Sequence, residues 1–337
     1  MKRCIVFVLV FVLPIVVVAG CGNAENMQPR GIRSGAGDGG RFSVVCTIFP
    51  QYDWVRQIIG DRSDMFDLTL FLDGNVDMHS YLPSVDDIVK VATCDLFIYI
   101  GGVSDGWVED ILMQAVNPDM AIIRLMGVLG EDAKQEEFVE GMENDDNEHG
   151  GNEHGGDDGE YDEHVWLSLR HAQIFCTAIA NALIALDSGG AAVYRGNLAA
   201  YIQELSALDA EYQAVVNASP VRTLLCGDRF PFRYLADDYG ISYYAAFPGC
   251  SAETEASFET IIFLSGKMDE LHLNSVLVTE SSNQTIAKTI IGNSQDKNQR
   301  ICTLNSMQAV GLGDAAYPAT YLSIMEGNLS VLREALG

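Results

Sequence analysis

One long helical pattern divides this chain into two similar halves. Between Val193 and Asn217, apolar residues recur at i, i+3 and i+4 spacing, with no proline and with one glycine near the start. On each side of this stretch, short β-rich runs alternate with helical segments. The sequence therefore predicts an α/β protein of two lobes, each a mostly parallel β-sheet flanked by helices, joined by one long α-helix.

The predicted strands fall into two sets. The first set is 42–49, 65–72, 94–100 and 121–125, and the second is 222–226, 242–247, 275–279 and 300–304. A last helical stretch covers residues 321–336. These elements predict an N-terminal lobe over 42–192, a linking helix over 193–217 and a C-terminal lobe over 218–337.

The start of the chain differs in composition from the rest. A positively charged beginning, Met1-Lys2-Arg3, precedes the apolar run Ile5 to Val18, which is too short for a membrane span of about 20 residues. The run ends in Val18-Ala19-Gly20-Cys21, which resembles the bacterial lipobox. This resemblance implies removal of a signal peptide, 1–20, and lipidation of Cys21. The glycine-rich segment 21–41 then has the composition of a flexible tether, so we expect an extracytoplasmic protein anchored to the cell membrane.

The chain is strongly acidic. Its formal net charge is −27, and loss of Lys2 and Arg3 with the signal takes it to −29. This charge argues against nucleic acid as a partner. The hydrophobic content of 48% is ample for one large or two medium cores, and no second apolar stretch has membrane-spanning length. We expect the part after the signal to be soluble and monomeric.

Six cysteines follow Cys21 and could pair outside the cell. They contain no CxxC motif, and most lie in apolar, strand-like surroundings, so buried free thiols and disulfides both stay open. The six are Cys46, Cys94, Cys176, Cys226, Cys250 and Cys302.

An acidic segment interrupts the first predicted lobe. Glu131 to His164 holds fifteen Asp and Glu residues against one lysine, a charge of −14, which predicts a solvated, mostly disordered loop over 131–163. Within it, Glu148-His149-Gly150-Gly151 is repeated as Glu153-His154-Gly155-Gly156. A plain acidic linker explains the charge but not these histidines. Because tracts rich in His and carboxylates collect metal ions, we expect His149 and His154 to recruit them.

Two other histidines stand where α/β proteins place ligands. His79 follows the predicted strand 65–72, and His164 immediately precedes a predicted helix. Loops at the carboxyl ends of parallel strands form the binding crevice in open α/β sheets. A lone histidine is more often an ordinary surface or core residue, but the order of elements allows these two to meet in one cleft.

Several motifs resemble the metal-binding solute-binding proteins of zinc and manganese ABC importers. They are Thr47-Ile48-Phe49-Pro50-Gln51-Tyr52-Asp53, Val76-Asp77-Met78-His79-Ser80-Tyr81, Cys94-Asp95-Leu96-Phe97-Ile98-Tyr99 and Asp162-Glu163-His164-Val165-Trp166-Leu167. The resemblance covers about 42–336 and includes the acidic His-rich loop that is a feature of the zinc members. It implies two lobes joined by a long helix, an ion in the cleft between them, and the importer's membrane permease as partner.

The resemblance also implies a set of metal ligands. Members of the family usually use two first-lobe histidines, matched here by His79 and His164, then a His or Glu early in the second lobe. Counting back from Tyr234 places Arg229 at that third position. Because an arginine cannot ligate a cation, the neighbouring Asp228 is the nearest competent oxygen.

The fourth position, usually Asp or Glu, falls on Asn305. Two interpretations stay open. In one, Asp228, Asn305 or Glu280 completes a distorted site, which zinc tolerates because its filled d shell imposes no geometry. In the other, Arg229 pairs with Glu255 or Glu280 and the second lobe contributes little. Both interpretations keep the two histidines as the core of the site.

Imidazole combined with hard oxygen favours Zn²⁺ and leaves Mn²⁺ open. A zinc hydrolase would use similar ligands, but no HExxH motif occurs. A surface adhesin or a passive metal buffer would share the anchoring features. We therefore expect a lipoprotein that captures Zn²⁺ in the cleft and hands it to a permease, without covalent chemistry.

Overall fold

The computed structural model describes residues 40–73, 78–143, 160–251, 255–313 and 319–337. Within them lie two four-stranded sheets, with the strand orders β2-β1-β3-β4 and β6-β5-β7-β8, and every pairing of these strands is parallel. The first sheet consists of β1 (Phe42–Cys46), β2 (Phe66–Leu70), β3 (Leu96–Tyr99) and β4 (Ala121–Arg124), and the second of β5 (Thr223–Phe230), β6 (Ser242–Pro248), β7 (Ser275–Thr279) and β8 (Arg300–Leu304).

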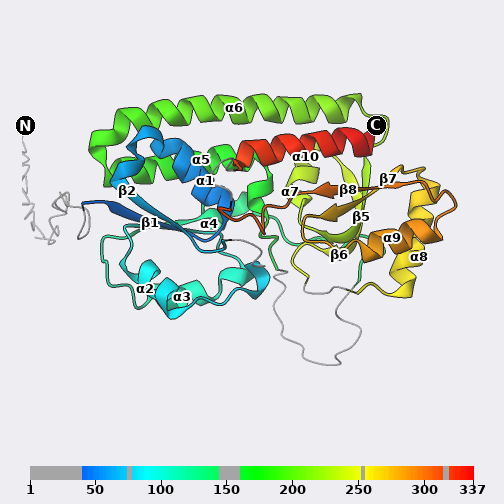
Figure 1. The fold of residues 1–337 in the computed structure, drawn as a ribbon, viewed down its shortest axis with the longest axis horizontal. Helices are drawn as coiled ribbons and strands as arrows, with labels where there is room; N and C mark the ends of the chain where they lie inside the picture. Colours follow the sequence, from blue (N-terminus) through cyan, green and yellow to red (C-terminus); the bar gives the residue numbers. More distant parts are fainter. Residues whose placement is uncertain (1–39, 74–77, 144–159, 252–254, 314–318) are drawn as a thin grey trace, which may run out of the picture. The chain divides into compact units, whose positions relative to one another are not determined.

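Helices cover both faces of each sheet (Figure 1). On the first sheet, α1 (Phe49–Ile59) and α5 (Leu169–Leu186) lie on one face, and α2 (Val85–Thr93) and α3 (Trp107–Leu112) on the other. The sequence alternation within β3 explains this, because Leu96 and Ile98 join one hydrophobic cluster while Phe97 and Tyr99 join the other. The remaining helices are α4 (Leu125–Leu129), α7 (Arg233–Tyr239), α8 (Phe258–Glu270), α9 (Thr285–Asn293) and α10 (Tyr321–Leu336).

The long helix α6 (Ala191–Ala218) runs past both lobes (Figure 1). It packs against α1 and α5 of the first lobe and against α7 and α10 of the second. Near its start, the Asn197 side chain donates to the Ile58 carbonyl at 2.9 Å, and further along, Tyr212 donates to the Met325 carbonyl at 2.6 Å. The prediction of one helix joining two α/β lobes is confirmed.

The expectation that no second apolar stretch has membrane-spanning length is wrong for helix α5, which is long and apolar enough to cross a membrane by length and composition alone. Its apolar side chains have partners within the protein, since Phe175, Ile179 and Leu183 are fully buried in the hydrophobic core. The helix therefore serves as a core helix of the first lobe.

All eight predicted strands are present, and β5 is the one that extends furthest beyond its predicted end. Strand β5 continues past Cys226 to Phe230, with a register shift between Cys226 and Arg229. It stops before Pro231, which disfavours helical backbone at the residue before it and has no N–H to donate to a ladder. Asp228 and Arg229, which follow the end of the predicted strand 222–226, therefore lie within β5.

The prediction of a mostly disordered loop is wrong for residues 131–143, which pack along the second lobe while most of their acidic side chains stay exposed. The Lys134 N–H donates to the Tyr234 hydroxyl at 2.8 Å, and the Glu143 N–H donates to the Ala246 carbonyl at 3.0 Å. Met142 is buried against the core. The acidic side chains are tolerated because they accept hydrogen bonds, as Glu137 does from Tyr243 at 2.9 Å. His149 and His154 lie outside the described residues.

Candidate metal centre

His79 lies on a short 3-10 turn, Met78–Ser80, beside a second turn, Val103–Asp105. Its Nδ1 atom is 2.9 Å from the Ser104 hydroxyl, and its side chain is 11% exposed. A hydrogen bond at one ring nitrogen fixes the orientation of the ring and selects a tautomer. Ser104 thus positions an imidazole that lines a cavity of about 360 Å³.

His164 is fully buried, immediately before the 3-10 turn Val165–Leu167. The Asp162 Oδ1 atom lies 2.9 Å from its Nδ1 and also accepts its backbone N–H at 2.8 Å. Because a carboxylate accepts in this contact, Nδ1 carries a proton, and Nε2 is the nitrogen that the neutral ring offers as a metal ligand. This carboxylate and imidazole arrangement is the usual outer support of a metal-binding histidine.

A thiol from the second lobe completes a cluster with the two histidines. The ring centroids of His79 and His164 are 5.5 Å apart, and each histidine and Cys250 offers a ligand atom within 4.8 Å of the others. Within the described part of the chain, this is the one group of three or more His, Cys, Asp or Glu residues found at such spacing. Burial raises the pKa of the Cys250 thiol, and the nearby Asp162 and Glu136 carboxylates raise it further.

Cys250 reaches the histidines because the preceding residue has no side chain. A Cβ atom on Gly249 would lie 3.1 Å from both Cε1 and Nδ1 of His164. The Cys250 N–H donates to Glu136 Oε1 at 2.8 Å, and the Arg229 guanidinium donates to the Ser251 carbonyl at 3.2 Å. The loop is therefore fastened on both sides of the thiol.

Glu163 adds a buried carboxylate beside the cluster. Its Oε1 atom accepts the Ser104 N–H at 2.8 Å, and its Oε2 atom lies 3.9 Å from His79 Nδ1. Oε2 is buried and has no hydrogen-bond partner among the described residues. Burial, together with the negative charge of Glu163, raises the pKa of the neighbouring Asp105 to about 6. A cation would satisfy the buried oxygen and offset the local negative charge, so the residues present fit a metal ion.

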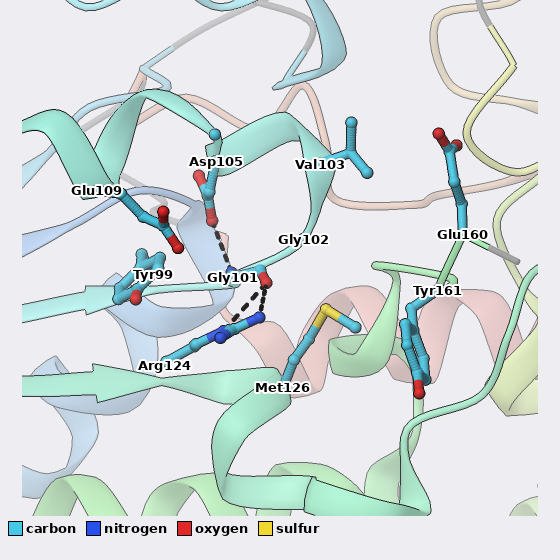
Figure 2. Close-up of a pocket in the computed structure, with 11 residues that line it drawn as sticks. Tyr99, Gly101, Gly102, Val103, Asp105, Glu109, Arg124, Met126, Glu160 and Tyr161 are labelled. Carbon is cyan, nitrogen blue, oxygen red and sulfur yellow. Dashed lines mark hydrogen bonds between the residues drawn. The ribbon is translucent and has the colours of Figure 1, made fainter. Parts of the chain in front are cut away.

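A second cavity of about 450 Å³ adjoins the first and shares Val103, Gly106, Glu160 and Tyr161 with it. Figure 2 shows the Arg124 side chain turned toward the Gly101 carbonyl, to which its Nε and Nη2 donate at 3.1 and 2.6 Å. The carboxylates of Glu109 and Glu160 also line this cavity. The cavity that His79 lines therefore adjoins one that carries several carboxylates and the Arg124 guanidinium.

Three of the residues considered for the second lobe have structural partners of their own. The Asp228 carboxylate accepts the Arg229 N–H at 2.8 Å and the Thr279 hydroxyl at 2.8 Å, and it lines a separate pocket. The Asn305 side-chain oxygen accepts the Met307 N–H at 2.8 Å. Glu280 accepts both the N–H and the hydroxyl of Ser306, at 2.7 and 2.8 Å.

Glu255 is exposed. Of the acidic residues that we considered, Asp228, Glu255 and Glu280 do not belong to the cluster of described residues around the histidines. The structure therefore brings together His79 and His164, and the second-lobe residue beside them is Cys250.

Sequence reasoning missed three residues at this centre, namely Cys250, Glu163 and Gln308. The Gln308 amide nitrogen lies 2.5 Å from Nε2 of His164, in the turn after β8. A signal for Cys250 was present, because Pro248-Gly249-Cys250 directly follows a predicted strand, and His79 likewise lies in the segment after one. All six cysteines after Cys21 are free thiols, and five of them are buried, which resolves the alternatives left open by the sequence.

A protein-family model described as "Zinc-uptake complex component A periplasmic" matches residues 44–335. The chain belongs to this family. It is 27% identical over 323 residues to the high-affinity zinc uptake system protein ZnuA of Bacillus subtilis, covering 95% of this chain and 93% of that protein. It is 26% identical over 297 residues to the zinc-binding lipoprotein AdcA of Streptococcus pneumoniae, covering 88% of this chain. The family resemblance predicted from the motifs is confirmed.

The chain spans only 56% of the length of the AdcA relatives it matches. Among solved structures, the Zn(II)-bound ZnuA-like domain of Streptococcus pneumoniae AdcA superposes with a TM-score of 0.67 at 23% identity, covering 88% of this chain and 99% of that domain. At this identity the likeness shows the fold alone. The family fold therefore accounts for the two lobes, while the centre itself has to be argued from this chain's own residues.

Proposed function

We propose that this chain captures Zn²⁺ between its two lobes and delivers it to the membrane permease of an ABC importer. The observation that carries the proposal is the meeting of His79 and His164 with a residue of the second lobe within 4.8 Å. The zinc names of relatives that match 88% and 95% of this chain support it. Family members are solute-binding components of importers rather than enzymes, and the same holds for this chain.

The neighbours of the histidines suit capture of a cation. Asp162 accepts at Nδ1 of His164, which directs Nε2 of the ring toward a metal ion, and Ser104 holds the His79 ring, so both imidazoles are oriented before an ion arrives. In the structure, the Gln308 amide occupies the side of His164 that an ion would need. Binding of an ion would therefore displace Gln308. The turn after β8, which carries Gln308, would then differ between the metal-free and the metal-bound protein.

Transport of labelled zinc tests this proposal. Cells that lack the protein should lose most zinc uptake when zinc is limiting, and re-expression should restore it. Cells that keep the protein but lack the permease should retain zinc at the surface without importing it. Replacing His149 and His154 with asparagine should slow uptake only at the lowest zinc concentrations, because the loop would recruit ions while the tight site lies elsewhere. Uptake that is unchanged without the protein would reject transport and leave an adhesin or a passive buffer.

We further propose that lipidation of Cys21 holds the protein at the membrane. The Cys21→Ser variant should fold normally but partition entirely into the aqueous phase in a detergent phase-separation assay, because no other anchor is proposed. The unmodified sequence should remain in the detergent phase. If the variant still sediments with membranes after a high-salt wash, the anchor lies elsewhere.

A further inference from the structure

We infer that Cys250 is a metal ligand, as a thiolate, and that it makes the centre select thiophilic divalent ions such as Zn²⁺ and Cd²⁺ over Mn²⁺. This inference rests on the proposed function and names the class of ion that the centre takes. The family resemblance implies second-lobe ligands at the positions of Arg229 and Asn305, and neither residue can supply a charged ligand there.

The loop that carries Cys250 has the features of a built site. Glu136 holds the Cys250 N–H at 2.8 Å, and Arg229 holds the adjacent Ser251 carbonyl at 3.2 Å. Because Gly249 has no side chain, the loop can approach the His164 ring closely. Arg229 thus lies at the expected ligand position but cannot bind a cation. Instead it holds the loop that carries Cys250, whose thiolate can.

The donor set decides the class of ion. Two imidazole nitrogens and one thiolate sulfur suit Zn²⁺, whose protein sites are commonly tetrahedral with nitrogen and sulfur ligands. The buried Oε2 of Glu163 is available as a fourth donor. Mn²⁺ prefers carboxylate, carbonyl and water oxygens, so replacing an oxygen by sulfur disfavours it.

Cobalt substitution tests the sulfur ligand directly. One equivalent of Co²⁺ added to the metal-free protein should produce an intense near-ultraviolet charge-transfer band from thiolate to cobalt, together with the visible bands of a low-symmetry Co²⁺ site. In the Cys250→Ser variant the near-ultraviolet band should disappear while the visible bands persist. Cys302→Ser is the matched control, because Cys302 lies on β8 outside the cluster, and its band should match that of the unmodified protein.

Competition titrations test the selectivity. Cys250→Ser should lower the affinity for Zn²⁺ and Cd²⁺ by at least about tenfold, and should change the affinity for Mn²⁺ by a smaller factor. A Cys250→Asp variant should narrow the preference for Zn²⁺ over Mn²⁺ further, because it replaces sulfur by a hard oxygen.

The outcomes separate this inference from the proposed function. If the unmodified protein binds Co²⁺ and Zn²⁺ tightly but shows no charge-transfer band, Cys250 is not a ligand, while the capture of zinc by the histidines stands. That result does not depend on the folding of any variant. If the unmodified protein binds neither ion, the proposed function fails together with the inference.

Discussion

Replacing His164 with alanine is expected to lower the affinity for Zn²⁺ by at least about a hundredfold, because losing even an outer partner of a metal ligand costs roughly 10–100-fold. His164 is the one fully buried member of the cluster, and in the proposed centre its Nε2 binds the ion after Gln308 moves away. Titration against a chromophoric chelator measures the loss. Asp162→Asn keeps the His164 ring but removes the carboxylate that selects its tautomer. The Zn²⁺ affinity of this variant should therefore be intermediate between those of His164→Ala and the unmodified protein.

His272→Asn provides the control for this experiment. His272 lies in the turn after α8, outside the cluster, and its positive φ of 52° is a conformation that asparagine tolerates and alanine does not. This variant should bind zinc like the unmodified protein. A thermal melt of the metal-free proteins separates lost ligation from lost folding. Unchanged zinc affinity in a folded His164→Ala protein would place the site elsewhere.

The affinity for Zn²⁺ should also rise by about tenfold for each pH unit between about pH 7 and 9, a range in which free imidazole is already neutral. Burial, followed by the charges of Asp162 and Glu136, raises the pKa of Cys250, so the thiol stays protonated without an ion. Zinc binds the thiolate and must release that proton, and a higher pH therefore favours binding. Acidification should lower the affinity for Zn²⁺ and so promote release of the ion.

Calorimetry in buffers of different ionisation enthalpy counts the protons released. One proton per zinc ion is expected for the unmodified protein and for Cys302→Ser, and none for Cys250→Ser. A flat pH profile with no proton release from the unmodified protein would show that the thiol takes no part in binding. The zinc titrations of the histidine variants would be unaffected by that result.

The lobes and the linking helix could be predicted because their signals are local. The strand at 275–279 is an apolar run with β-branched residues, and its predicted bounds agree with those of β7. The helix over 193–217 differs from α6 by only a few residues at its ends. The ordered path of segment 131–143 could not be predicted, because its charge suggests disorder and the donors that satisfy its carboxylates lie in the other lobe.

The first-lobe half of the centre followed from the motifs around His79 and His164, whereas the second-lobe half depends on tertiary structure. Counting residues back from Tyr234 gives a position in the sequence, but it cannot show that β5 extends to Phe230 and turns Asp228 toward Thr279. Cys250 is one of several cysteines in apolar surroundings. Its distinguishing feature is its proximity to His164, which depends on a close approach through Gly249.

The buried stripe of α6 belongs to the interior of both lobes. Tyr194 and Tyr201 pack within the same continuous cluster that contains Tyr212 and Val216, and this cluster reaches from β1 to α10. Neither lobe would retain a complete interior if the other unfolded, because part of the stripe would then be exposed to water. The two lobes should therefore unfold in a single cooperative transition. A substitution that destabilises either lobe should then lower the free energy of unfolding of the entire two-lobed protein.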